Sequence, residues 1–125
     1  MKLTERLSRS PYFGKNTDNK FLDLLLNLVF AQKINKGEFL VKAGEVCDRL
    51  IYIQTGLVRI FRTTEEKEIT TWFVKEGDFI TTVNSFHLGV PSEESFEALE
   101  DCVIYSINKK SYYLLAEMSS QFAPF

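Results

Sequence analysis

Residues 36–56 read KGEFLVKAGEVCDRLIYIQTG and contain two short β-rich runs, EFLVK and RLIYIQT. A glycine follows each run, at Gly44 and Gly56. Glycine tolerates the positive φ that a tight turn requires, because it has no Cβ. The segment therefore predicts two strands separated by a sharp turn.

The same pattern continues on both sides of this segment. AQKIN precedes it, and LVRIFRT, EITTWFV, DFITT and CVIYSIN follow, with short turn sequences such as TEEK and KEG between them. About eight short strands without βαβ alternation are typical of a sandwich or barrel. We therefore expect a mainly β fold, a jelly-roll β-barrel over about residues 30–108.

Two amphipathic helices flank the predicted strands. In FLDLLLNLV, Leu22, Leu25, Leu26 and Val29 share one face at helical spacing, which predicts a helix over 18–29 capped by Thr17 or Asp18. A closing helix is expected over 109–118, after a cap at Asn108. The helices should pack together outside the barrel and bury Leu25, Leu26, Tyr112 and Leu115. We also expect Trp72 and Phe73 to contact the core and a flanking helix.

Composition indicates one cytoplasmic domain over residues 1–125. The chain has 125 residues and a formal net charge of −2, and this length suits a single core. The charged N-terminus does not resemble a signal peptide, and the apolar run 24–31 is too short to span a membrane. Cys47 and Cys102 lack CxxC spacing, so both are interpreted as reduced, buried thiols.

Residues 36–56 resemble the cyclic nucleotide-binding domain of Crp/Fnr-type bacterial transcription regulators. The resemblance rests on K-G-x-x-L/V-x-x-x-G-E and Y-I-x-x-G, continues through Gly77-Asp78-Phe79-Ile80, and covers about residues 18–118. It implies a jelly roll with flanking helices and a sensor role for a small-molecule effector. In that family a helix-turn-helix domain follows the sensor domain and binds DNA. No such domain is expected in this chain.

In that family the loop after G-D-F-I binds a phosphate through the pattern G-E-L/I-A-L/G-x-F followed by R-S/T-A. The arginine contacts the phosphate and the glutamate accepts from the ribose hydroxyl. Here Thr81-Thr82 replace Gly-Glu, and Ser92-Glu93 replace Arg-Ser/Thr, with Glu94 next. The loop has no lysine or arginine between Lys75 and Lys109. Because carboxylates repel a phosphate, we expect no ordinary binding of cAMP or cGMP.

The loop still offers candidate ligand-binding residues: Thr81, Thr82, Asn84, Ser85, Ser92 and Glu93. Their hydroxyl, amide and carboxylate groups suit a neutral or cationic metabolite. The alternative is that the polar side chains bond to the backbone of their own loop, as these residue types readily do.

Catalytic and metal chemistry has little support in the sequence. His87 is the single histidine, which is too few for a cupin-type metal site and lacks fixed partners for a catalytic triad. We expect a solvated or capping loop histidine, no metal, no cofactor and no enzyme activity. Two alternatives to the sensor stay open: a single-domain interaction or scaffold module, and true cyclic-nucleotide binding through a variant pocket.

Expected partners follow from charge and from exposed apolar residues. Residues 63–125 hold 4 Lys and Arg against 11 Asp and Glu, so this chain alone should not bind duplex DNA. DNA binding would require a C-terminal domain outside this chain. An apolar surface near Phe122 and Phe125 predicts weak self-association into a homodimer.

Overall fold

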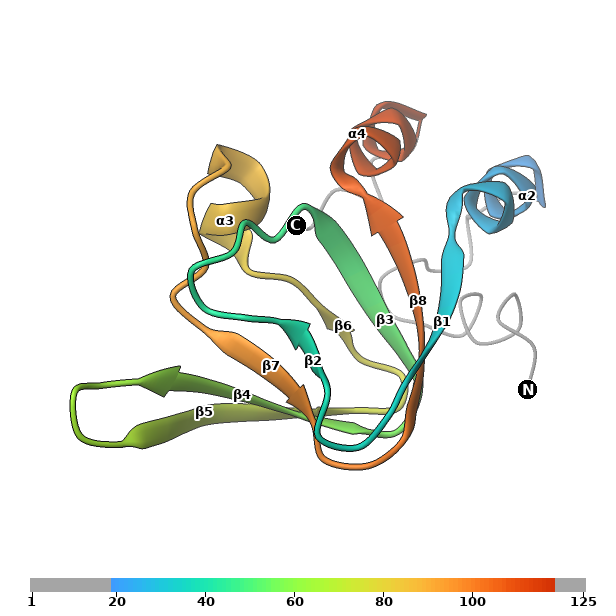
Figure 1. The fold of residues 1–125 in the computed structure, drawn as a ribbon. Coiled ribbons are helices and arrows are strands. Elements are labelled where there is room, and N and C mark those ends of the chain that lie inside the picture. Colours follow the sequence, from blue (N-terminus) through green and yellow to red (C-terminus); the bar gives the residue numbers. More distant parts are fainter. Residues whose placement is uncertain (1–18, 119–125) are drawn as a thin grey trace.

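The computed structural model of the chain describes residues 19–118 (Figure 1). The elements are, in order, α2 (Asn19–Leu28), β1 (Phe30–Ile34), β2 (Phe39–Val41), β3 (Arg49–Thr55), β4 (Leu57–Thr63), β5 (Glu68–Lys75), β6 (Phe79–Ile80), α3 (Val83–Leu88), β7 (Ser95–Ala98), β8 (Cys102–Asn108) and α4 (Lys109–Met118). Thr17, Asp18, Phe122 and Phe125 lie outside the described residues.

The strands form two four-stranded sheets with orders β1-β8-β3-β6 and β2-β7-β4-β5. All of the strand pairs are antiparallel. This confirms the mainly β jelly roll with flanking helices. The two sheets do not close into a continuous barrel, because their edge strands, within the described residues, do not pair with each other.

The core lies between the two sheets. Ile51 and Ile53 of β3, Ile104 of β8 and Val58 of β4 are all completely buried, and they pack in one hydrophobic cluster. Cys102 is buried in the same cluster as a free thiol, and burial raises the pKa of that thiol. Cys47 is likewise free and buried, so the interpretation of both cysteines as buried thiols is confirmed.

Gly56 carries the chain from one sheet to the other. Its φ is +114°, a conformation that residues with side chains rarely adopt. A Cβ at this position would lie 2.9 Å from the Cα of Cys102, which is too close. The turn therefore requires glycine for both its conformation and its packing.

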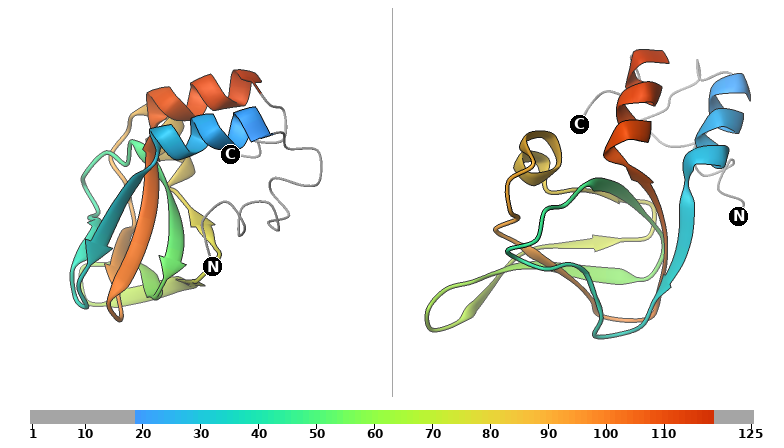
Figure 2. Two further views of the ribbon diagram at one scale, coloured as in Figure 1. Left: turned by 90° about the vertical axis from the view of Figure 1, so that its right-hand side faces the viewer. Right: turned by 45° about the horizontal axis from the view of Figure 1, so that its top comes forward.

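Helices α2 and α4 lie side by side outside the first sheet (Figure 2). Leu25, Tyr112 and Leu115 are buried there in a second cluster that includes Phe86 of α3. These three burial predictions are confirmed. The prediction for Leu26 was wrong, since its side chain is 36% exposed. One helical step rotates a side chain by about 100°, so Leu26 leaves the face on which Leu25 is buried.

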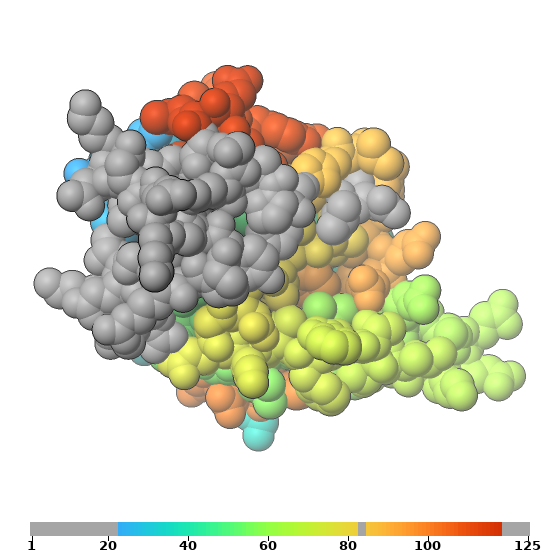
Figure 3. All heavy atoms as spheres, turned by 180° about the vertical axis from the view of Figure 1, so that it is seen from behind, coloured from blue at the N-terminus to red at the C-terminus, as the bar shows by residue number. Residues whose placement is uncertain are grey.

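The β4–β5 hairpin projects from the body of the molecule (Figures 1 and 3). Trp72 is 66% exposed and Phe73 is 55% exposed, so the prediction that they contact the core and a helix was wrong. The reason is topological: β5 is the edge strand of its sheet. No described helix packs on the hairpin.

Candidate ligand-binding site

A cavity of about 530 Å³ lies between the β4–β5 hairpin and the segment that leads from β6 through α3 to β7. The lining residues are Arg62, Thr71, Thr81, Thr82, Ser85, Val90, Pro91, Glu93 and Glu94. Ligand sites of small molecules usually have volumes of this order. Two regions far apart in the sequence thus form opposite walls of one cavity.

Helix α3 forms part of the cavity wall and is fixed to the rest of the molecule by Phe86. This side chain is completely buried, and its ring centre lies 5.1 Å from that of Tyr112 in an edge-to-face arrangement. The helix ends at Gly89, whose φ of +71° allows its N–H to donate to the carbonyl of Ser85. The motif residues Phe86 and Gly89 therefore shape the loop.

His87 also lies in α3, not in a loop, which corrects the expectation of a solvated or capping loop histidine. It is half-buried, and its Nδ1 lies 2.6 Å from the hydroxyl of Tyr113 in α4. The ammonium group of Lys109 donates to the His87 carbonyl at 3.1 Å. Both contacts connect the cavity wall to the closing helix. Among the described residues, no three His, Cys, Asp or Glu side chains are grouped as metal ligands.

The hydroxyls of Thr81 and Ser85 line the cavity but bond to the protein. Ser85 Oγ accepts from the backbone N–H of Cys47 at 2.6 Å, and Ser85 is 1% exposed. Thr81 Oγ1 donates to the carbonyl of Arg49 at 3.0 Å. These two bonds attach the segment after β6 to the segment 47–49.

Thr82 and Ser92 bond to each other across the loop, with their hydroxyl oxygens 3.3 Å apart. Ser92 Oγ also donates to the carbonyl of Glu94 at 2.7 Å. Ser92 is buried and is not among the lining residues. The side chain of Asn84 lies outside what the structure describes. Of the six predicted site residues, Thr81, Thr82, Ser85 and Glu93 therefore line the cavity.

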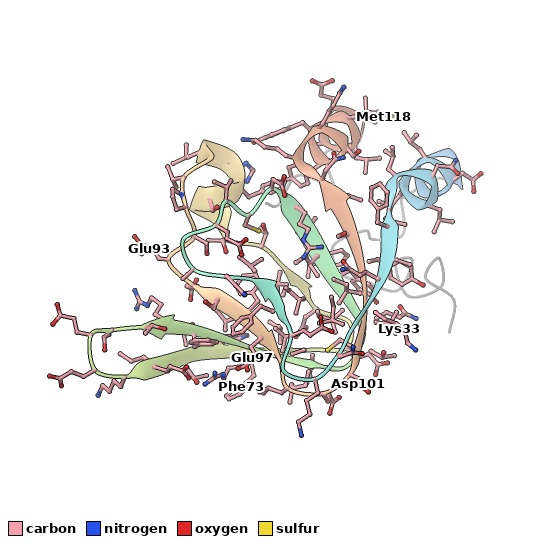
Figure 4. All side chains as sticks on the ribbon, viewed as in Figure 1. Lys33, Phe73, Glu93, Glu97, Asp101 and Met118 are labelled. Carbon is pink, nitrogen blue, oxygen red and sulfur yellow. The ribbon has the colours of Figure 1, made fainter. Side chains whose placement is uncertain are left out.

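The charged groups of the cavity are Arg62, Glu93 and Glu94. Glu93 lies on the loop between α3 and β7 (Figure 4), is exposed, and lines the cavity. Glu94 Oε2 accepts from the hydroxyl of Thr71 on β5 at 2.8 Å. Arg62 forms no ion pair with any described residue.

Arg59 on the same strand differs from Arg62, because its guanidinium forms ion pairs with two carboxylates. It donates to Glu97 at 2.6 Å and to Glu68 at 3.0 Å, and its guanidinium lies 4.0 Å from the ring centre of Phe61. The hydrogen bond with Glu97 raises the pKa of Arg59 above its ordinary value. Arg62 has no such partner among residues 19–118, so within this part of the chain its charge is available to a ligand.

Arg62 is not among the site residues predicted from the sequence, because it lies outside the loop that the family motif identifies. A signal was present in β4, where side chains alternate between the two faces of the strand. Val58 is buried in the core and Ile60 packs against it. Arg62 continues the same alternation and reaches the cavity at the end of the strand.

The family model described as the cyclic nucleotide-binding domain matches residues 31–118. The chain belongs to this family. A comparison with curated proteins finds no match.

Solved structures share the fold at low sequence identity. The catabolite activator protein of Thermus thermophilus aligns with a TM-score of 0.80 and 23% identity over 91% of this chain and 53% of its own. The sensor domain of the transcriptional regulator DNR from Pseudomonas aeruginosa aligns with a TM-score of 0.79 and 17% sequence identity. The alignment covers 96% of this chain and 84% of the DNR sensor domain.

A third structure is the regulatory subunit of a cAMP-independent protein kinase A from Trypanosoma cruzi, bound to guanosine. It gives a TM-score of 0.78 and 16% identity over 92% of this chain and 41% of its own. This chain therefore spans about half or less of the activator and the kinase subunit. None of the helices in residues 19–118 has the length and apolar character needed to cross a membrane.

Proposed function

We propose that this chain is the effector-sensing domain of a Crp/Fnr-type regulator, and that its cavity does not bind cAMP or cGMP in the family's usual way. One observation carries the proposal. Glu93 and Glu94 line the cavity, and the whole segment 76–108 contains neither lysine nor arginine. The loop therefore presents carboxylates where the family presents an arginine.

Electrostatics explains why this change matters. Two unit charges 4 Å apart interact by about 4 kcal/mol at an effective dielectric constant of 20, the value typical near a protein surface. A cyclic phosphate beside Glu93 and Glu94 would meet two such repulsions, each reduced by solvent. Arg62 offsets one of them. It lies on the opposite wall, on β4, so it does not restore the arginine of the loop.

One structural neighbour supports a ligand without a phosphate. The Trypanosoma cruzi kinase subunit is cAMP-independent and was solved bound to guanosine. Guanosine has no phosphate group, so this fold accommodates an uncharged nucleoside in that protein. An effector without a phosphate suits the carboxylates of the present cavity for the same reason.

Thermal unfolding in the presence of nucleotides tests the proposal. A ligand that binds only the folded state raises its stability by RT ln(1 + [L]/Kd). We expect millimolar cAMP and cGMP to leave the Tm unchanged. A Tm that rises with cyclic-nucleotide concentration would refute the proposal and favour cyclic-nucleotide binding through a variant pocket.

A second candidate function, an interaction module, is favoured by strand β5. This edge strand exposes Trp72 and Phe73, and an unpaired edge with apolar side chains readily pairs with another strand. A second copy fits it, because antiparallel pairing of two β5 strands would place Glu68 of each beside Lys75 of the other. Sedimentation of the wild type and Trp72→Ser tests this: a dimer that Trp72→Ser dissociates supports the module, and a wild-type monomer at high concentration contradicts it.

A Crp/Fnr-type regulator must also contact DNA. We propose that DNA contacts come from a region other than residues 1–125, because the second half of this chain is acidic and affinity for DNA rests on neutralised phosphates. A gel-shift titration of this chain at physiological salt should show no complex. A salt-resistant protein–DNA band would contradict this assignment.

A further inference from the structure

We infer that the cavity takes a zwitterionic small molecule, with its anionic group at Arg62 and its ammonium group at Glu93 and Glu94. The inference rests on the proposed function and names its ligand class. Within the described residues, the hydroxyls of the cavity form hydrogen bonds to the protein, whereas its charged groups form no ion pairs.

The hydroxyls that line the cavity already have partners within the protein. Ser85 and Thr81 bond to the backbone of residues 47 and 49. Thr82 bonds to Ser92. Within the described residues, the charged groups of the cavity that make no ion pair are the guanidinium of Arg62 and the carboxylates of Glu93 and Glu94.

These free groups carry opposite charges and do not pair with each other. Arg62 and Glu93 line the same cavity, yet no ion pair joins them within 4.0 Å. A ligand that lies between them meets a cation on the β4 wall and carboxylates on the loop wall. An arginine binds a carboxylate or phosphate in a forked, charge-assisted geometry, and carboxylates accept in the same way from an ammonium group.

A ligand with a single charge fits this arrangement less well. An anion at Arg62 alone would leave the carboxylate of Glu93 without a partner, and a cation at Glu93 alone would leave Arg62 without one. Charge-assisted hydrogen bonds are the strong ones, so a singly charged ligand gains less from this cavity. A molecule with both charges satisfies both walls. Its two charged groups must be separated, because Arg62 and Glu93 do not reach each other.

A series of straight-chain ω-amino acids tests the inference, because chain length sets the distance between ammonium and carboxylate. The probes are the four-, six- and eight-carbon members, with hexylamine and hexanoate as singly charged controls. For the full chain, we expect at least one ω-amino acid at millimolar concentration to raise the Tm by about 2 °C or more. The two controls should raise it less.

Two variants and two controls locate the binding charges. Arg62→Gln and Glu93→Gln should each weaken binding of the effective ω-amino acid by about tenfold or more, as expected for hydrogen bonds to charged groups. Lys67→Gln and Glu66→Gln make the same charge changes in the turn between β4 and β5, outside the lining residues. These controls should bind as the wild type does.

The outcomes separate this inference from the proposed function. Equal stabilisation by hexylamine and the ω-amino acids would overturn the zwitterion and leave the sensor in place. The inference is also overturned if no chain length has an effect, or if Arg62→Gln binds like Lys67→Gln. The proposed function itself is tested separately, with cAMP and cGMP and with DNA.

Discussion

The hydroxyl groups and the charged groups of the cavity behave in opposite ways. Ser85 and Thr81 are bonded to the backbone of the neighbouring segment, whereas Arg62 makes no ion pair with a described residue. The difference separates two tasks within one site. The hydroxyls keep the loop in shape, and the charges determine which ligand the loop accepts.

The same difference predicts how substitutions divide between stability and binding. Changes to the buried residues that hold the loop should lower the free energy of unfolding. Changes to the exposed charges should leave stability close to the wild type and alter ligand preference.

The largest effect is expected for Phe86→Ala. Phe86 is completely buried between α3 and the closing helix, and a buried Phe→Ala change typically costs about 3–5 kcal/mol. Urea unfolding of this variant should show that loss. Leu88→Ala on the same helix is the control, since Leu88 is 71% exposed and should change stability by about 0.5 kcal/mol or less. Similar losses in both variants would contradict the anchoring role of Phe86.

Ser85→Ala should have the next largest effect. It removes the acceptor of the Cys47 N–H at a buried position, and a buried donor left without a partner costs about 1–3 kcal/mol. The matched control is Ser111→Ala in α4, where the hydroxyl bonds to no described residue. Chemical unfolding should separate the two variants, and an unaffected Ser85→Ala would show that this hydroxyl does not hold the loop.

The smallest effects concern the two arginines of β4. Arg59→Gln removes bonds to Glu97 and Glu68, and partial exposure limits the expected loss to about 1 kcal/mol. Arg62→Gln should change the free energy of unfolding by less than about 0.5 kcal/mol, because no described partner is lost. Thermal unfolding of both variants without ligand checks this order. A larger loss of unfolding free energy for Arg62→Gln would mean that the guanidinium already interacts with another group of the protein.

Much of the fold could be predicted from the sequence because local signals agree with it. The β-rich runs RLIYIQT and CVIYSIN predicted β3 and β8, and Leu25 and Leu115 were correctly placed on buried helix faces. Exposure on β5 could not be predicted in this way. EITTWFVK reads as a strand with apolar side chains, but which strand ends a sheet depends on pairing between distant segments.

The site was less predictable for the same reason. The departures of the loop from the family motif were visible at Thr81, Thr82, Ser92 and Glu93. The hydrogen bonds of the Ser85 and Thr81 hydroxyls were not visible, because their partners are backbone groups of residues 47 and 49. Arg62 enters the cavity from another strand, and only the folded chain shows it opposite Glu93.

An NMR titration of the isotopically labelled chain tests the central claim, that the charged groups of the cavity select its ligand. The ω-amino acid that raises the Tm most should shift the resonances of Arg62, Thr71, Glu93 and Glu94, which line the cavity. Equal concentrations of cAMP should leave these resonances in place. Saturable shifts at these residues with cAMP, or shifts scattered over the surface with the amino acid, would contradict the account.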